Sequence, residues 1–371
     1  MTLRYTPVVT GLPATVPFVG PEAQERLRGR LFRARIGANE SVFGPSPRAI
    51  AAMAEAAQDC WMYGDPDNYD LKAALAKHHS VKPENIAVGE GIDSLFGYTV
   101  RMFVQPGGAD TVVTSAGAYP TFNFHVAGFG GRLVTVPYIN NQEDPQSLLD
   151  AAREVRPKLI YFANPDNPMG SWWSADALQW LIKGVPSETL LVLDEAYSEF
   201  APKGSVPPLD VSNAQVLRYR TFSKAYGMAG ARVAYVIGEA GVIRNFDKIR
   251  NHFSVSRIAQ AGALAALADQ TYLADVVDRV ATARERIGAI GRANGLTPLP
   301  SATNFVTLDC GRDGDYAKRV LDGLIVRDVF VRMPGVAPLN RCIRVSAGRD
   351  IDLALFADAL PLALSAAALT T

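Results

Sequence analysis

A lysine lies in a segment whose residues are suited to binding a phosphate group. Lys224 is part of Thr-Phe-Ser-Lys-Ala-Tyr-Gly-Met-Ala-Gly-Ala-Arg, residues 221–232. The glycines leave backbone N–H groups open, while Thr221, Ser223 and Arg232 add hydroxyls and a guanidinium, the usual parts of a phosphate cup. Most lysines are solvated surface residues, but the apolar, glycine-rich flanks of Lys224 are not those of a charged helix face.

A carboxylate ends an apolar run shortly before that segment. Asp194 follows Thr-Leu-Leu-Val-Leu, and Tyr197 comes three residues later. A buried carboxylate is costly unless it meets a cation or donors, and taken alone Asp194 would be a helix cap or a structural ion pair. Together, however, an amine, a phosphate cup and a carboxylate from the neighbouring strand are what pyridoxal 5'-phosphate (PLP) requires. The sequence therefore predicts that Lys224 carries this cofactor.

The elements that must position these residues follow a regular order. Short apolar runs alternate with helical periods, which predicts an α/β fold with a mostly parallel sheet covered by helices. Ligands of such sheets bind at the carboxyl ends of the strands, and the candidate residues do follow the runs. The predicted strands are residues 86–88, 111–114, 133–136, 159–162, 190–193, 216–219 and 233–237.

The 371-residue chain divides into three parts. The irregular, proline-rich residues 1–45 predict an N-terminal arm, and residues 46–259 a large cofactor-binding domain. Residues 260–371 predict a smaller α/β domain. Its helices and strands are expected at 260–294, 304–308, 325–331, 343–345 and 351–369.

Composition argues against several classes of function. Basic and acidic residues number 37 each, so a zero net charge gives no electrostatic case for binding nucleic acid or an anionic membrane. The three cysteines and four histidines show neither disulfide nor metal-site spacing, which favours a cytoplasmic protein without a bound metal. The apolar stretch 360–369 is too short to span a bilayer and predicts a packed terminal helix.

Three motifs resemble those of the class I and II, fold-type I aminotransferases. Residues 223–232 resemble the lysine segment of that family, residues 194–197 (Asp-Glu-Ala-Tyr) its pyridine-binding strand, and residues 164–170 (Asn-Pro-Asp-Asn-Pro-Met-Gly) its Asn-Pro turn. Further segments resemble the histidinol-phosphate aminotransferase branch and extend the similarity over almost the whole chain. They are residues 37–47, 63–67, 89–93, 301–305, 325–328 and 342–348.

The resemblance implies roles for residues around the cofactor. Lys224 would hold the cofactor covalently and act as the general base, and Asp194 would bind the ring nitrogen. Tyr197 and Asn167 would donate to the ring's phenolic oxygen, and Tyr119 would stack on the ring. The phosphate would be bound by Thr221, Ser223, Arg232, the backbone of Gly91, Ile92 and Asp93, and Tyr63 of a neighbouring subunit.

The resemblance also implies a homodimer with a shared active site and a substrate site built from Asn39, Arg327 and Arg344. Arg344 would bind the substrate carboxylate as a two-pronged donor, a geometry that lysine cannot copy. Arg327 would meet a substrate phosphate, as in histidinol-phosphate enzymes. The chain would then move an amino group from histidinol phosphate or an aromatic amino acid to a 2-oxo acid by ping-pong kinetics.

Two other functions are compatible with part of this pattern. The first is decarboxylation of a phosphorylated amino acid such as threonine phosphate, because such enzymes share much of the motif set. The second is a ligand-sensing regulator on the same fold. The second is disfavoured because the N-terminal arm has neither a helix-turn-helix pattern nor a basic excess, and because the set of residues needed for catalysis is complete.

Overall fold

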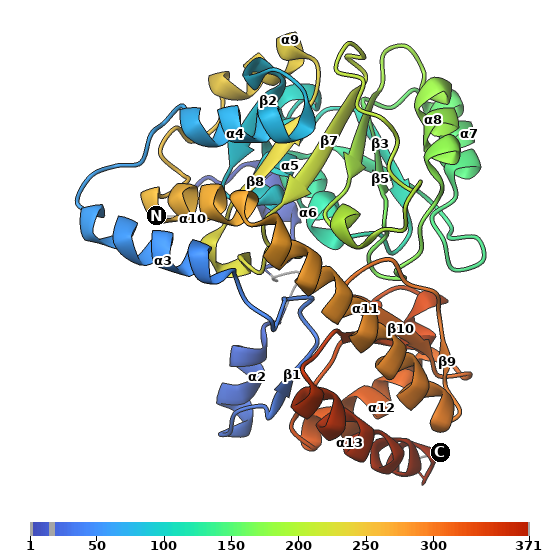
Figure 1. The fold of residues 1–371 in the computed structure, drawn as a ribbon. Coiled ribbons are helices and arrows are strands. Elements are labelled where there is room, and N and C mark those ends of the chain that lie inside the picture. The colour runs from blue at the N-terminus through green and yellow to red at the C-terminus, as the bar shows by residue number, and fades with distance from the viewer. Residues whose placement is uncertain (1–2, 15–18, 370–371) are drawn as a thin grey trace.

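The computed structural model describes residues 3–14 and 19–369. Its large domain is built on a seven-stranded sheet (Figure 1). The strands are β2 (Ile86–Gly89), β3 (Thr111–Ser115), β4 (Arg132–Val136), β5 (Leu159–Ala163), β6 (Leu190–Asp194), β7 (Val216–Thr221) and β8 (Ala234–Ile237). Their order is β2-β8-β7-β6-β5-β3-β4, and only β8 runs against its neighbours. The predicted mostly parallel sheet is confirmed.

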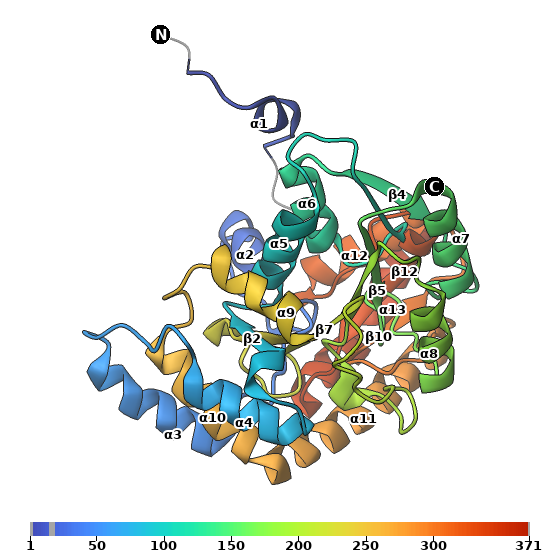
Figure 2. The same ribbon diagram turned by 90° about the horizontal axis from the view of Figure 1, so that it is seen from above.

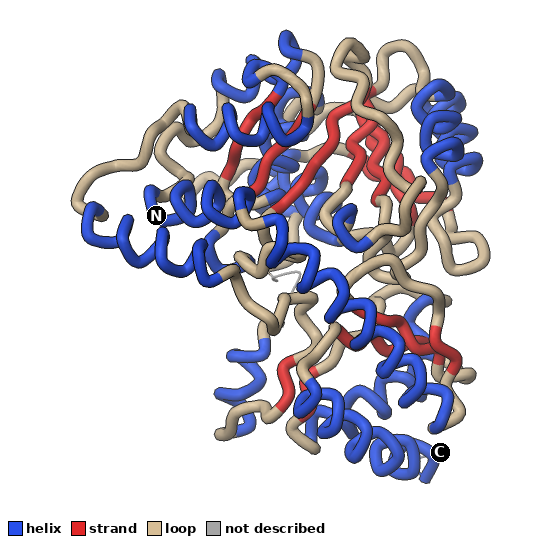
Figure 3. Tube along the Cα trace, in the orientation of Figure 1, coloured by secondary structure: helices blue, strands red, loops and turns tan. Residues whose placement is uncertain are grey.

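Helices cover both faces of this sheet (Figure 3). Successive side chains of a strand point in opposite directions, so alternate residues of β6 pack on opposite faces of the sheet. Val192 packs in the core with α5 and α6, and Leu191 in the core with α7 and α8. A further core under β2 and β8 contains α3, α4 and α10. These helices are α3 (Pro47–Ala56), α4 (Tyr69–His79), α5 (Ile92–Phe103), α6 (Pro120–Phe129), α7 (Pro145–Val155), α8 (Ala175–Gly184) and α10 (Arg257–Ala268), with the short α9 (Ala240–Ile243) nearby.

The small domain combines two short sheets with three helices. Strands β12, β10 and β9 form an antiparallel sheet, and β1 from the N-terminal arm pairs in parallel with β11. The arm therefore supplies the strand β1 to this domain, whereas its first helix, α1, lies against α6 of the large domain (Figure 2). The elements of the arm are α1 (Pro7–Gly11), α2 (Pro21–Arg28) and β1 (Ala34–Arg35). Those of the rest of the small domain are α11 (Gln270–Ala293), β9 (Thr297–Pro298), β10 (Phe305–Asp309), α12 (Gly314–Val326), β11 (Val329–Phe330), β12 (Cys342–Ser346) and α13 (Asp350–Leu369).

Two predicted elements differ from the structure. The helix expected over 260–294 is interrupted at Asp269, whose side chain caps α11 by accepting from the backbone N–H of Tyr272 at 3.4 Å. The helix before this break, α10, packs on α3 of the large domain, so only α11 leads into the small domain. The strand expected over 325–331 is reduced to Val329–Phe330, because α12 continues to Val326 before the chain turns.

The C-terminal helix α13 is mostly apolar but carries aspartates in its N-terminal half. With 20 residues and a mean hydropathy of 1.6 it is long and apolar enough to cross a membrane, whereas the expectation considered only the ten residues 360–369. In the structure, however, one side of α13 is buried in the main core through Leu353, Phe356, Leu360 and Ala363, and the helix packs along α12. The predicted packed terminal helix is confirmed.

Candidate active site

The carboxyl ends of three neighbouring strands open on one cavity of about 200 Å³. Because parallel strands end at the same edge of a sheet, β5, β6 and β7 bring their following segments together here. β5 leads to Asn167, β6 ends at Asp194 and leads to Tyr197, and β7 leads to Lys224. Other lining residues are Glu40, Ile92, Asp93, Tyr119, Thr221, Ser223 and Arg232.

Lys224 is held at the centre of this cavity by the N-terminal arm. Its Nζ donates to the backbone oxygen of Asn39 at 3.1 Å. Asn39 is buried and has a left-handed backbone (φ 56°), which turns its carbonyl toward the lysine. Burial and the positive charge of Arg344 lower the pKa of Lys224 to about 8. The amine is therefore available as a neutral nucleophile and base near neutral pH.

Asp194 is a buried carboxylate that faces the cavity without a cation. It accepts from the hydroxyl of Tyr161 at 2.7 Å and from the backbone N–H of Ala196 at 3.0 Å. Among the residues that the structure describes, it forms no ion pair. Burial raises its pKa to about 6. Such a group is well suited to bind a protonated ring nitrogen, which would supply the missing cation.

The opposite end of the cavity is a cup of anion-binding groups. Gly91 precedes α5 with a φ of 94°, and a Cβ at this position would overlap the guanidinium of Arg232. Arg232 also approaches the Ser223 hydroxyl at 3.5 Å, and this hydroxyl accepts from Thr221 at 2.9 Å. The N-terminus of α5 adds open N–H groups and the positive end of a helix dipole. The arrangement fits a phosphate.

Two aromatic side chains form the walls of the cavity. Tyr119 donates to Asp93 at 3.0 Å. The hydroxyl of Tyr197 accepts from the amides of Asn39 at 3.1 Å and Asn167 at 3.4 Å, while burial raises its pKa above the usual value. The sequence-predicted Lys224 segment, pyridine-binding strand and Asn-Pro turn are thus brought together around one cavity.

A second cavity of about 370 Å³ adjoins the first and shares Tyr119 and Asn167 with it. Its lining is mainly apolar, with two arginines, Arg332 and Arg344. Arg344 donates to the side-chain oxygen of Asn167, and its Nε is buried without a partner. Burial and the charge of Arg332 lower the pKa of Arg344 to about 10. Apolar lining residues include Val19, Leu321, Ile325, Phe330, Met333 and Val336.

One predicted substrate residue lies outside both cavities. Arg327 lies at the C-terminal end of α12, donates to the backbone oxygen of Gly323 at 2.8 Å and lines neither cavity. Arg332 lies in the second cavity instead. Arg327 follows the apolar pair Ile-Val and Arg332 follows the apolar run Val-Phe-Val, but only the second run contains a strand. The second run was the signal in the sequence that pointed to Arg332.

Two other predicted residues lie in places that do not test their roles. Tyr63 is 78% exposed, contacts the ring of Phe253 (4.8 Å between centroids) and lines neither cavity. Its contact with a neighbouring subunit's cofactor stays a prediction. Asn39 uses its side chain within the protein, because Nδ2 donates to Tyr197 and Oδ1 accepts from Ser346 at 3.1 Å. It therefore positions the site's own groups.

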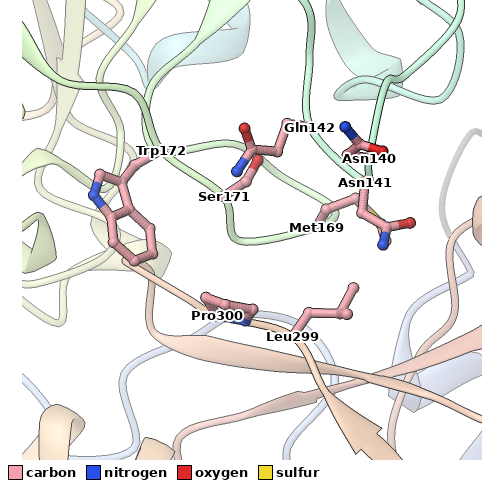
Figure 4. A pocket seen from close by; sticks show the side chains of 8 residues that line it. All are labelled: Asn140, Asn141, Gln142, Met169, Ser171, Trp172, Leu299 and Pro300. Atoms are coloured by element: carbon pink, nitrogen blue, oxygen red, sulfur yellow. The ribbon is translucent and has the colours of Figure 1, made fainter.

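A third cavity lies on the far side of the Asn-Pro turn (Figure 4). It has a volume of about 350 Å³ and contains no charged lining residue. Figure 4 shows Asn140, Gln142 and Ser171 above Leu299 and Pro300, with Trp172 at one end. The Asn-Pro turn thus contributes to both cavities, with Asn167 lining the catalytic cavity and Met169 lining this one.

No group of three or more potential metal ligands occurs within residues 3–14 and 19–369.

The family model for aminotransferase class I and II matches residues 35–360. Histidinol-phosphate aminotransferase of Moorella thermoacetica is 32% identical over 93% of this chain and 87% of its own. Aromatic amino acid aminotransferase of Mycobacterium marinum is 37% identical over 83% and 84%.

The chain belongs to the class I and II aminotransferases. The crystal structure of histidinol-phosphate aminotransferase from Sinorhizobium meliloti in complex with PLP is 54% identical to this chain. It covers 98% of both chains with a TM-score of 0.95. The protein is thus a PLP-dependent aminotransferase with the fold-type I architecture. Its own residues fit this cofactor, since the cavity has a buried carboxylate without a cation at one end and an anion cup at the other.

Proposed function

We propose that this aminotransferase takes its amino group from histidinol phosphate or an aromatic amino acid and passes it to a 2-oxo acid. The observation that carries the proposal is the second cavity, where two arginines lie among apolar side chains directly beside the cofactor cavity. Arginine binds carboxylate and phosphate, and apolar walls suit a flat imidazole or aromatic side chain. The names of the relatives agree with both donor types.

The cofactor-binding residues are proposed from their geometry. Arg232, Ser223, Thr221 and the N-terminal turn of α5 after Gly91 hold the phosphate. Asp194 binds the ring nitrogen at the other end. PLP, when bound, supplies an aldehyde that accepts the amino group and a ring that withdraws electrons from the donor's Cα.

Other side chains orient the cofactor ring. Tyr119 would lie against one face of the ring. Tyr197 and Asn167 would donate to its phenolic oxygen. These two are already linked by a hydrogen bond of 3.4 Å, so that they act as a preassembled pair of donors.

Lys224 moves the proton. Its Nζ takes the proton from Cα of the donor, because a pKa of about 8 leaves part of the amine neutral near neutral pH. Arg344 contributes to this value through its positive charge. Asn39 of the arm covers the lysine on one side, because its backbone oxygen accepts from Nζ.

The two arginines divide the recognition of the donor. Arg344 lies nearer the reacting groups, because it is bonded to Asn167, and its unpartnered Nε is available for a substrate oxygen. Arg332 is placed to bind a carboxylate or phosphate further out. One site can then accept a phosphorylated amine in one half-reaction and a dicarboxylic 2-oxo acid in the other.

A homodimer with a shared active site and a cytoplasmic location complete the proposal. Exposed aromatic side chains are concentrated near Tyr63: Trp61 is 81% exposed and Tyr69 73%. Large exposed aromatic groups are typical of protein interfaces. They support a dimer in which this segment reaches the other subunit.

The alternative, a PLP-dependent decarboxylase, is supported less well. The L-threonine-O-3-phosphate decarboxylase of Porphyromonas gingivalis shares the fold at 19% identity. The aminotransferase relatives are much more similar to this chain.

The test adds single donors to the purified holoenzyme and follows the absorbance of the bound cofactor. Histidinol phosphate, phenylalanine, tyrosine, glutamate and threonine phosphate are compared. A donor that bleaches the band, with recovery on adding a 2-oxo acid, identifies the substrate class. Release of CO2 from threonine phosphate without need for a 2-oxo acid would support the decarboxylase instead.

A further inference from the structure

Two acidic residues that take no part in the proposed chemistry lie buried beneath the Asn-Pro turn. Glu143 precedes α7, and Asp166 is the third residue of the turn itself. Each has only 1% of its surface exposed. Their carboxyl groups hydrogen bond to one another. Neither forms an ion pair with a basic side chain in the described part of the chain.

Each carboxyl group is fixed by donors from other segments. Glu143 accepts from the Ser115 hydroxyl at 2.7 Å and from the backbone N–H of Ala163 at 3.0 Å. Asp166 accepts from the Tyr138 hydroxyl at 2.8 Å and from the backbone N–H of Met169 at 3.0 Å. The pair therefore ties the ends of β3 and β5 and the loop after β4 to the turn.

The turn that this pair supports carries a residue of the active site. Asp166 is followed by Asn167, which binds Arg344 and Tyr197. Pro168 in the same turn accepts from Thr307 of the small domain at 2.8 Å. The empty space of the third cavity lies on the other side (Figure 4). The turn is also held there by Met169, which packs with Leu299 and Leu339, and by Gly170, whose carbonyl accepts from the backbone N–H of Ala302 at 2.8 Å. The carboxyl pair adds the buried polar contacts at Asp166 to this support.

Two adjacent carboxylates cannot both be ionised in such a place. Burial penalises each negative charge, and the repulsion between them adds to the penalty. The other titratable groups that face the pair are Tyr138, Tyr161, Tyr197, Asp194 and Arg344. Only Arg344 is cationic. It bonds to Asn167, the residue after Asp166, and its positive charge favours the ionised form of Asp166. A proton between the two carboxyl groups relieves the repulsion and makes one of them a donor.

We propose that Glu143 and Asp166 share a proton, and that this proton holds the Asn-Pro turn so that Asn167 keeps Arg344 in place for the substrate. Both are positioning residues. Loss of the proton leaves two adjacent carboxylates, which separate and displace the turn. The inference rests on the proposed function of Arg344, but the shared proton itself is independent of it.

The electrostatics agree with this arrangement. Burial raises the pKa of Asp166 to about 7 and that of Glu143 well above its usual value. A carboxyl group whose pKa is raised by folding stabilises the protein fully below its unfolded-state pKa of about 4, and this contribution is lost as the pH rises from there through the folded-state value. Stability should therefore fall from mildly acidic pH upward, whereas substrate binding should weaken as the folded protein loses the proton, near and above neutrality.

The test replaces Glu143 by glutamine, which donates to Asp166 at every pH. The KM for the amino donor and the midpoint of thermal unfolding are measured for the holoenzyme from about pH 5 to about pH 9. The wild type should show a several-fold larger rise in KM and a larger fall in the midpoint than Glu143→Gln. The kcat should change less than KM. Asp144→Asn, which removes a neighbouring carboxylate outside the pair, should follow the wild type.

A second variant guards against a folding defect. If Glu143→Gln does not fold, Asp166→Asn should show the same flattened pH profile. Equal slopes of both KM and unfolding midpoint in the wild type and in the variant would overturn the proposal. If no amino donor is turned over, the proposed substrate class fails, while the pH dependence of unfolding still decides whether the proton is shared.

Discussion

The two ends of the active site are built in different ways. At the cofactor end, most of the lining residues come from short segments that directly follow neighbouring strands of one sheet. The substrate end collects Val19 from the arm, Arg332 and Met333 after β11, and Arg344 from β12. The first arrangement is fixed by the sheet, whereas the second depends on how the small domain is packed. Substrate choice can therefore change while the cofactor chemistry stays in place.

The largest effect is expected at the centre of the cofactor end. Lys224→Ala should reduce turnover by about 10⁴-fold or more, because it removes both the covalent attachment point and the general base. Steady-state rates and the absorbance of the cofactor measure this. Lys82→Ala, at a surface lysine, should leave both unchanged. Retained multiple turnover in Lys224→Ala would contradict the assignment.

The next largest effect should separate the two ends. Arg344→Lys keeps the charge but loses the forked geometry, so the KM for an amino-acid donor should rise by about 10- to 100-fold. The affinity for PLP, measured by titrating the apoenzyme, should change little. An equal loss of donor and cofactor binding would mean that Arg344 has a structural role.

A matched pair of arginine variants tests the corrected substrate end. Arg332→Gln should raise the KM for a phosphorylated or dicarboxylic substrate by about tenfold, since one charged hydrogen bond is lost. Arg327→Gln should stay within about twofold, because the half-buried Arg327 lines neither cavity and bonds only to the end of its own helix. The opposite ranking of the two KM values would restore Arg327 to the substrate site.

The smallest of these effects concerns the backbone of the phosphate cup. In Gly91→Ala the new methyl group would overlap Arg232, and the positive φ adds strain of about 1–3 kcal/mol. The dissociation constant of PLP should rise by about tenfold, with KM for the donor less affected. Gly11→Ala, where a Cβ meets nothing within 4 Å, is the control. An unchanged PLP affinity in Gly91→Ala would remove Gly91 from the cup.

The same contrast explains what the sequence predicts and what it does not. The strands of the large sheet and the grouping of Asp194, Asn167 and Lys224 follow from local apolar runs and from the rule that parallel strands share an edge. The position of Arg332 depends on where α12 ends. The pair Ile325–Val326 is β-branched and suits a strand, but Leu324 and Val320 continue a buried helical face that extends the helix.

The Glu143–Asp166 pair shows another limit. Nothing in the sequence brings residue 143 to residue 166, because their contact depends on how the loop after β4 folds against β5. The break at Asp269 was also missed, since the alanine-rich pattern continues on both sides of it. The Asp269 side chain can end one helix and start the next, against the alanine-rich pattern, only when α10 is held in place by its packing on α3.

The long helix α11 connects the break at Asp269 to the strands of the small domain. It has 24 residues and is therefore about 36 Å long. It begins at the break beside Asp269, and Arg284 along its length donates to the backbone oxygens of Ser301 and Thr303. A rotation of about 5° at its start carries its far end through about 3 Å. Because β9 and β10 pack beside α11 and β12 pairs with β10, any change of angle at this break would shift Arg344 relative to Lys224.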